Sequence, residues 1–164
     1  MKYLKINLIL VALVCFSFTS CSNEEDGIYF DEINETKVEY SLMELELLDL
    51  VNAHRIELDL HSLESLNIIS SVALSHTNYM VEIDQVNHDY FPVRQENLVL
   101  KADAKSVGEN VAYGYNSSKA VLNAWLNSDA HRAIIENKNY THFGISIKQN
   151  SEGRNYFTQM FIKK

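Results

Sequence analysis

The stretch from Asn155 to Ile162, which reads Asn-Tyr-Phe-Thr-Gln-Met-Phe-Ile, indicates the fold class most clearly. Successive residues of a β-strand point to opposite faces of a sheet, so Phe157 and Phe161 share one face, whereas Met160 and Ile162 share the other. Both faces are apolar, and a strand that is apolar on both faces needs a covering layer on each. The stretch therefore predicts a sheet that is buried between two layers.

A second strand precedes this stretch. Phe143, Ile145 and Ile147 alternate with small or polar residues, and residues 150–153 have the composition of a turn. The two strands together predict an antiparallel hairpin at the C-terminal end of the chain.

Helices are predicted upstream by apolar residues at helical spacing. The first begins at Ser41 and Glu44, which form a capping-box pattern, and the second runs from about Leu66 to Ile83. A third starts near Ser118, and a short one follows Ser128. Residues 84–115 show no clear period and are predicted to be irregular. Helices and a small sheet with two apolar faces predict an α+β fold, a three-layer α-β-α sandwich around a small antiparallel sheet.

Composition excludes several classes of protein. The chain has 164 residues, 14 of them Lys or Arg against 22 Asp or Glu, and a formal net charge of -8. This length predicts one domain, and the acidic balance argues against a nucleic-acid partner. The two cysteines are too few for a disulfide scaffold or for a zinc site with four thiolates.

The first 20 residues have the pattern of a signal peptide. Lys2 and Lys5 precede an apolar run that is too short to span a membrane comfortably, and the run ends before Cys21. Small residues directly before a cysteine resemble a bacterial lipobox, so we expect lipidation of Cys21 and a lipid anchor in the membrane. The alternative is simple secretion, in which Cys21 is incidental. Loss of residues 1–20 removes two lysines and no acid, which changes the net charge from -8 to -10.

A polar segment separates this cysteine from the domain. Residues 21–40 form an acidic tether in the predicted organisation, with the domain at residues 41–164. Residues 22–26 resemble the acidic stretch that follows the lipidated cysteine in surface-exported lipoproteins of the Bacteroides group. A merely solvated linker would explain the same composition.

Common catalytic motifs are absent from the sequence, including the zinc motif His-Glu-x-x-His and the serine motif Gly-x-Ser-x-Gly. The six histidines are dispersed, but three polar residues lie in unusual surroundings. His88 and Glu109 fall in the stretch without a clear period, and Glu109 follows a glycine. His131 lies at the junction of two predicted helices. These three residues are the candidates for a functional site.

The same residues belong to stretches that resemble, in order, the motifs of one family. The stretches are Val51-Asn52-Ala53-His54-Arg55, Ala73-Leu74-Ser75-His76, Asn87-His88-Asp89, Gly108-Glu109-Asn110, Trp125-x-x-Ser128-x-x-His131-Arg132 and Tyr156-Phe157-Thr158-Gln159. They resemble the bacterial branch of the CAP superfamily, the SCP-like extracellular domain of cysteine-rich secretory proteins, antigen 5 and pathogenesis-related 1 proteins. The resemblance covers residues 42–162 and implies an α-β-α sandwich, in agreement with the strand pattern.

The resemblance also implies a cavity lined by four polar residues. Three positions correspond to His88, Glu109 and His131, and the fourth, often a histidine in eukaryotic members, is Tyr156 here. A phenol is a poor neutral metal ligand. His88, His131 and Glu109 would suit a divalent ion, with Zn²⁺ the best match, and Glu109 would be a ligand or a general base. The alternative is a hydrogen-bonded cluster without metal.

Other polar residues are interpreted as structural. His76 lies in the apolar stripe of its helix and is expected to bond to the main chain, while His142 is expected at the surface, where it could approach His131. Gln159 lies between two phenylalanines on an apolar face. A buried amide needs hydrogen-bond partners, so Gln159 is expected to hold a loop at residues 108–110.

Three functions remain open from the sequence. The first is a membrane-anchored binding module, attached to the outer membrane of the cell envelope, that recognises an envelope or host component. The second is a metal-dependent hydrolase, although no activated nucleophile is evident beside the three candidates. The third is an interaction protein whose site is vestigial, as Tyr156 suggests. Whether the chain is an enzyme is left undecided.

Overall fold

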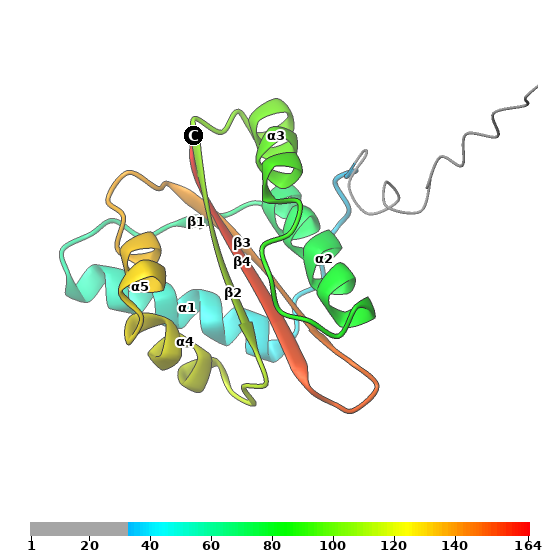
Figure 1. The fold of residues 1–164 in the computed structure, drawn as a ribbon. Coiled ribbons are helices and arrows are strands. Elements are labelled where there is room, and N and C mark those ends of the chain that lie inside the picture. The colour runs from blue at the N-terminus through cyan, green and yellow to red at the C-terminus, as the bar shows by residue number, and fades with distance from the viewer. Residues whose placement is uncertain (1–32) are drawn as a thin grey trace, which may run out of the picture.

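The computed structural model describes residues 33–164, so the predicted signal peptide, Cys21 and the first part of the tether lie outside the described residues. Figure 1 shows a sheet with helices on both sides. The elements follow in the order α1 (Leu42–Glu57), β1 (Glu64–Ser65), α2 (Asn67–Glu82), α3 (Phe91–Ala102), β2 (Ser106–Tyr113), α4 (Ser118–Leu126), α5 (Asp129–Ile135), β3 (His142–Gln149) and β4 (Asn155–Lys163). Within this part of the chain, none of the helices combines the length and hydrophobicity that crossing a membrane requires.

The sheet has the strand order β1-β3-β4-β2. The predicted hairpin of β3 and β4 is confirmed, and β2 pairs antiparallel with the other side of β4. The two-residue β1 runs parallel to β3, so the sheet is mixed rather than purely antiparallel. This order leaves β2 as an edge strand, whose only partner among residues 33–164 is β4.

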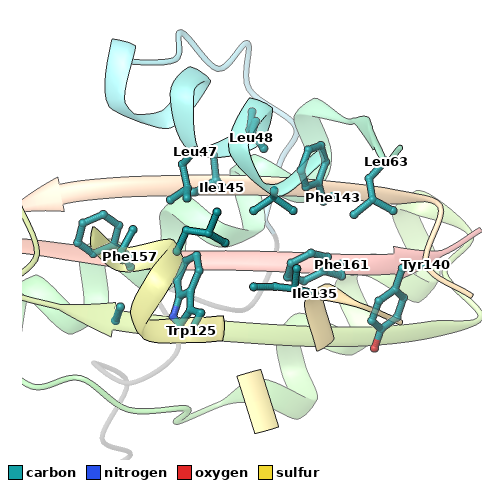
Figure 2. Close-up of a cluster of buried hydrophobic side chains, with 14 residues drawn as sticks. Leu47, Leu48, Leu63, Trp125, Ile135, Tyr140, Phe143, Ile145, Phe157 and Phe161 are labelled. Carbon is teal, nitrogen blue, oxygen red and sulfur yellow. The ribbon is translucent and has the colours of Figure 1, made fainter. Parts of the chain in front are cut away.

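The strand β4 is buried on both faces, as its sequence predicts. Phe157 and Phe161 pack into a cluster with side chains of α1, α4 and α5, among them Leu47 and Trp125 (Figure 2). On the opposite face Met160 and Ile162 pack against residues of α2 and α3. The three-layer α-β-α sandwich is therefore confirmed.

The first helix begins at the predicted capping box. The Ser41 hydroxyl accepts a hydrogen bond from the Glu44 main chain, and the Glu44 carboxylate accepts one from the Ser41 main-chain N–H at 2.7 Å. The other carboxylate oxygen of Glu44 accepts from the Ile147 N–H, also at 2.7 Å. This side chain caps α1 and at the same time ties it to β3.

The prediction of an irregular stretch at residues 84–115 is wrong, because that stretch contains α3 and β2. In α3 two buried positions carry Arg94 and Asn97, so polar side chains interrupt the apolar stripe. In β2 the neighbours Glu109 and Asn110 are both buried, so alternation of apolar and polar residues is lost. Polar side chains in the interior hid both elements.

The end of the predicted tether is held against the domain. Ile33 is buried in the same cluster as Leu98 of α3, and its N–H donates to the Asn97 side chain at 3.4 Å. The Thr36 N–H donates to Ser71 of α2 at 3.1 Å, and the Tyr40 hydroxyl bonds to Ser70 at 2.6 Å. Residues 33–40 therefore pack on the helical layer rather than acting as a free linker.

Candidate functional site

Three elements bring the predicted site residues to one edge of the sheet. His88 lies in the segment between α2 and α3, Glu109 lies in the edge strand β2, and His131 lies in α5. Because α3 and α5 cover opposite faces of the sheet, the segment before α3 and the helix α5 flank β2 from its two sides.

Glu109 is the buried anchor of the site. Its side chain is 2% exposed, and its carboxylate forms two hydrogen bonds with the Arg94 guanidinium, at 2.7 and 2.8 Å. The Nδ1 atom of His88 bonds to the same carboxylate at 2.8 Å. An ionised carboxylate only accepts hydrogen bonds, so Nδ1 of His88 must carry the proton. The half-exposed ring of His88 then directs Nε2 away from Glu109.

The charge of Glu109 is stabilised in this position. Burial alone would raise the pKa of the carboxyl group, but the hydrogen bonds from His88 and Arg94 and the charge of Arg94 lower the pKa below its ordinary value. Both carboxylate oxygens are occupied by these partners. The arrangement therefore suits Glu109 to orienting His88 more than to accepting a proton from a substrate.

His76 supports the segment that carries His88. Its ring is fully buried, and Nε2 donates to the Asn87 carbonyl at 3.0 Å, as expected for a packed histidine. Burial, followed by the charge of Arg94, lowers the pKa of His76 to about 4. The ring is therefore neutral at physiological pH and acts as a fixed hydrogen-bond donor beneath the site.

His131 lines the same hollow as His88. That hollow measures about 530 Å³ and is also lined by Trp125 and by residues 111–113 of β2. Burial, followed by the charge of His88, lowers the pKa of His131. The Nδ1 atom of His131 is buried and has no hydrogen-bond partner among residues 33–164.

Tyr156 lies in a different environment. Its hydroxyl donates to Asp84, just after α2, at 2.7 Å, and its ring packs on Tyr113 at a centroid distance of 4.7 Å. Burial and the bond to Asp84 raise the pKa of the phenol. The structure thus places His88 against Glu109 and lines one hollow with His88 and His131, whereas Tyr156 holds β4 to the end of α2.

Two expectations about neighbouring residues are corrected. His142 is largely buried and lies within 3.6 Å of Glu64 in β1, at the edge of the sheet opposite the one that His131 flanks. Residues 108–110 form part of β2 rather than a loop, with Asn110 paired to Gln159 in the sheet register. Neither polar atom of the Gln159 side chain has a hydrogen-bond partner in the described part of the chain.

Comparison with known proteins identifies the family. The model of the cysteine-rich secretory protein family, CAP, matches residues 48–161. The chain belongs to the CAP family. This CAP protein is 34% identical over 124 residues to the uncharacterized membrane protein YlbC of Bacillus subtilis, an alignment that includes 74% of the present chain and 34% of YlbC. It therefore spans about a third of the length of that relative.

Solved structures of similar fold agree with the architecture. An outer surface protein from Borrelia burgdorferi superposes with a TM-score of 0.69 at 22% identity, covering 80% of this chain and 99% of that one. An extracellular protein containing an SCP domain from Bacillus anthracis gives a TM-score of 0.64 at 26% identity, with coverages of 74% and 40%. These similarities support the CAP fold.

The donor set of this CAP domain limits how a metal ion can bind. Among residues 33–164, no three side chains of His, Cys, Asp or Glu lie together as a ready metal site. The carboxylate of Glu109 is committed to Arg94, a cation that would repel a divalent ion placed beside it. The open ring nitrogens of His88 and His131 are the donors that remain.

One residue of the site was not expected from the sequence. Arg94 is fully buried, and in addition to Glu109 it binds the Asp89 carbonyl at 2.6 Å, next to His88. A single arginine within a predicted irregular stretch resembles an ordinary surface residue. Pro92 at the start of α3 was the available local signal, because proline is favoured in the first turn of a helix.

Proposed function

We propose that this CAP protein is an extracytoplasmic binding module, attached to the cell envelope through Cys21. Its ligand site is the hollow between His88 and His131 at the edge of β2. The names of the similar proteins, which describe a membrane protein, an outer surface protein and an extracellular protein, support a location outside the cytoplasm. The lipobox-like sequence before Cys21 supports the anchor.

The orientation of His88 is the observation on which this proposal rests. Glu109 fixes its Nδ1 at 2.8 Å, and the ring is 53% exposed, so Nε2 is presented to a ligand in a defined direction. A buried ion pair costs desolvation energy, and here the pair of Arg94 and Glu109 holds the exposed imidazole in one orientation. Such preorganisation favours binding because little side-chain entropy is lost when the ligand arrives.

A divalent ion is one ligand that this arrangement suits. The imidazoles of His88 and His131 would hold it, with Glu109 as the carboxylate that orients the first imidazole from behind. The remaining positions on the ion would be free for water or for an oxygen of a larger ligand, and the bound ion would supply positive charge there. Zn²⁺ is the best match to two imidazole donors.

Hydrolysis is a second candidate, which one observation favours. A histidine whose Nδ1 is bonded to a buried carboxylate and whose Nε2 is open has the arrangement of a general base. It would act on water at the mouth of the hollow. Loss of turnover of an envelope substrate in the variant His88→Ala would support this candidate, and unchanged turnover would contradict it.

The binding function is tested by retention of the full-length protein on isolated cell envelopes. A variant with His88→Ala and His131→Ala removes the two imidazoles of the hollow, and a matched control with His54→Ala and His142→Ala removes two imidazoles outside it. We expect saturable retention of the wild type and of the control, and at least tenfold weaker retention of the first variant, as for loss of a binding centre. Equal retention of all three proteins would contradict the proposal.

A further inference from the structure

The edge strand β2 presents a row of main-chain groups that do not pair with β4. In an antiparallel pair, residues alternate between those that exchange main-chain hydrogen bonds with the partner and those that point away. The Gly114 N–H donates to the Asn155 carbonyl at 2.8 Å, which fixes this alternation for the whole ladder. The even-numbered residues of β2 therefore bond to β4. The odd-numbered ones point outward, namely Val107, Glu109, Val111 and Tyr113.

One interaction confirms this direction. The indole N–H of Trp125 donates to the Val111 carbonyl at 3.0 Å from outside the sheet. Among residues 33–164 no hydrogen bond is found to the other outward main-chain groups of these four residues. Unpaired edge groups are a template for another extended chain unless a protein covers them.

This edge is the floor of a groove. The hollow of about 530 Å³ lies over residues 111–113, and a second hollow of about 430 Å³ lies over residues 107–109. His88 lines both hollows. One wall is lined by Val86, Asn87, His88 and Phe91, and the other by residues of α4 and α5 together with Tyr140. The groove thus follows the strand on both sides of His88.

The lining of the groove differs in charge from the rest of the molecule. The chain as a whole is acidic, with 22 carboxylate residues. Of the residues in the described part of the chain that line the two hollows, Glu109 alone is acidic, and its side chain is 2% exposed and paired with Arg94. The polar centre of the groove consists of the imidazoles of His88 and His131. A negatively charged group on a ligand would therefore meet no exposed carboxylate there.

We propose that the groove binds an extended acidic peptide, which adds as a further strand to the edge of β2 through the outward main-chain groups other than the Val111 carbonyl, which Trp125 occupies. An acidic side chain of the peptide faces His88 and His131 and accepts a hydrogen bond from Nε2 of the doubly protonated His88 ring. Apolar side chains on either side of it enter the two hollows. This inference rests on the proposed function, since it names the class of partner for the same site. Strand addition explains why the unpaired main-chain groups, the two hollows and the imidazoles lie along one line.

Synthetic peptides of eight residues, the length of β2, provide the probe. Each carries apolar residues at alternate positions and a central Glu, and binding to the full-length protein is measured by fluorescence anisotropy. Two series are N-methylated, one on the odd and one on the even main-chain nitrogens. We expect one series to bind about tenfold more weakly and the other to bind normally, because alternate N–H groups of an added strand face β2. Equal affinity of the two series would overturn the proposal.

Replacement of the central Glu by Gln in the peptide tests the charge. We expect the Gln peptide to bind the wild type several-fold more weakly than the Glu peptide and the two peptides to bind the variant His88→Ala equally. A preference for the Glu peptide that persists in this variant would overturn the assignment of His88 as the partner of the acidic side chain. Failure of every peptide to bind better than its scrambled counterpart would also overturn it. If the protein is still retained on envelopes through His88 and His131 in that case, the proposed function stands and only the peptide is excluded.

Discussion

At the scale of single residues, Arg94 holds the site together. It is fully buried and neutralises Glu109 through two hydrogen bonds, while a third bond reaches the Asp89 carbonyl. Glu109 in turn orients His88. The half-exposed imidazole therefore depends on a cation that never reaches the surface.

Removal of that cation gives the first prediction. The variant Arg94→Met leaves Glu109 charged and buried, and we expect the free energy of unfolding to fall by about 3–5 kcal/mol. The double variant Arg94→Met, Glu109→Leu contains neither charge and should recover part of that loss. Urea unfolding of the three proteins measures both effects. A double variant less stable than the single one would contradict this account of the pair.

His76 gives a prediction for pH. Its pKa is lowered from 6.5 to about 4 in the fold. Between these two pH values His76 is therefore protonated in the unfolded chain and neutral in the folded chain. Stability is therefore lost as the pH falls from 6.5 towards 4, and His76 should account for about 2 kcal/mol between about pH 7 and about pH 5.

The variant His76→Gln keeps a hydrogen-bond donor but cannot titrate. Acidification from about pH 7 to about pH 5 should therefore lower the free energy of unfolding by about 2 kcal/mol less in this variant than in the wild type. His61→Gln, which replaces an exposed histidine elsewhere in the chain, is the matched control for the substitution itself. Identical pH dependence of all three proteins would show that His76 does not carry the effect.

At the scale of elements, the orientation of β2 predicts an alternating response to proline. The Val107 N–H points away from β4, so Val107→Pro should cost little more than Val107→Ala. The Ala112 N–H bonds to β4, so Ala112→Pro loses a hydrogen bond and leaves an acceptor unpaired, which costs at least about 1–3 kcal/mol. Thermal or urea unfolding measures the difference. If Val107→Pro lowers the stability more than Ala112→Pro does, our assignment of which residues of β2 bond to β4 is reversed.

Elements with regular patterns were predictable from the sequence. The capping box located α1, helical periods located α2 and α4, and alternation located β3. The run of apolar residues on both faces after a turn located β4. The strand β2 and the helix α3 were missed because Glu109, Asn110 and Arg94 occupy interior positions. The polar residues that build the site interrupt the patterns by which helices and strands are found. The short parallel strand β1 has no pattern of its own.

The site was predictable in part, because some of its residues lie in family motifs and others do not. Family motifs pointed to His88, Glu109 and His131, which the fold gathers at one edge. The departure at Tyr156 was visible in the sequence, but its bond to Asp84 was not, since it depends on contact between β4 and the end of α2. Arg94 has no motif, and only its burial beside Glu109 reveals its role.

At the scale of the whole molecule, the anchor proposed at Cys21 determines where the groove operates. We expect the full-length protein to incorporate labelled fatty acid in bacterial cells and to fractionate with membranes. Cys21→Ser should abolish both without a change in the thermal stability of the domain. If Cys21→Ser carries no labelled fatty acid but still fractionates with membranes, lipid anchoring through this residue is contradicted.

The central claim is that His88 and His131 form one binding centre, and zinc titration by calorimetry tests it most directly. The account predicts that the full-length wild type and the control His54→Ala, His142→Ala take up one Zn²⁺ per chain with equal affinity. It predicts at least tenfold weaker binding in His88→Ala and likewise in His131→Ala, because each removes one of two ligands. Zinc affinity that is unchanged in both single variants, or lost instead in the control, would contradict the claim.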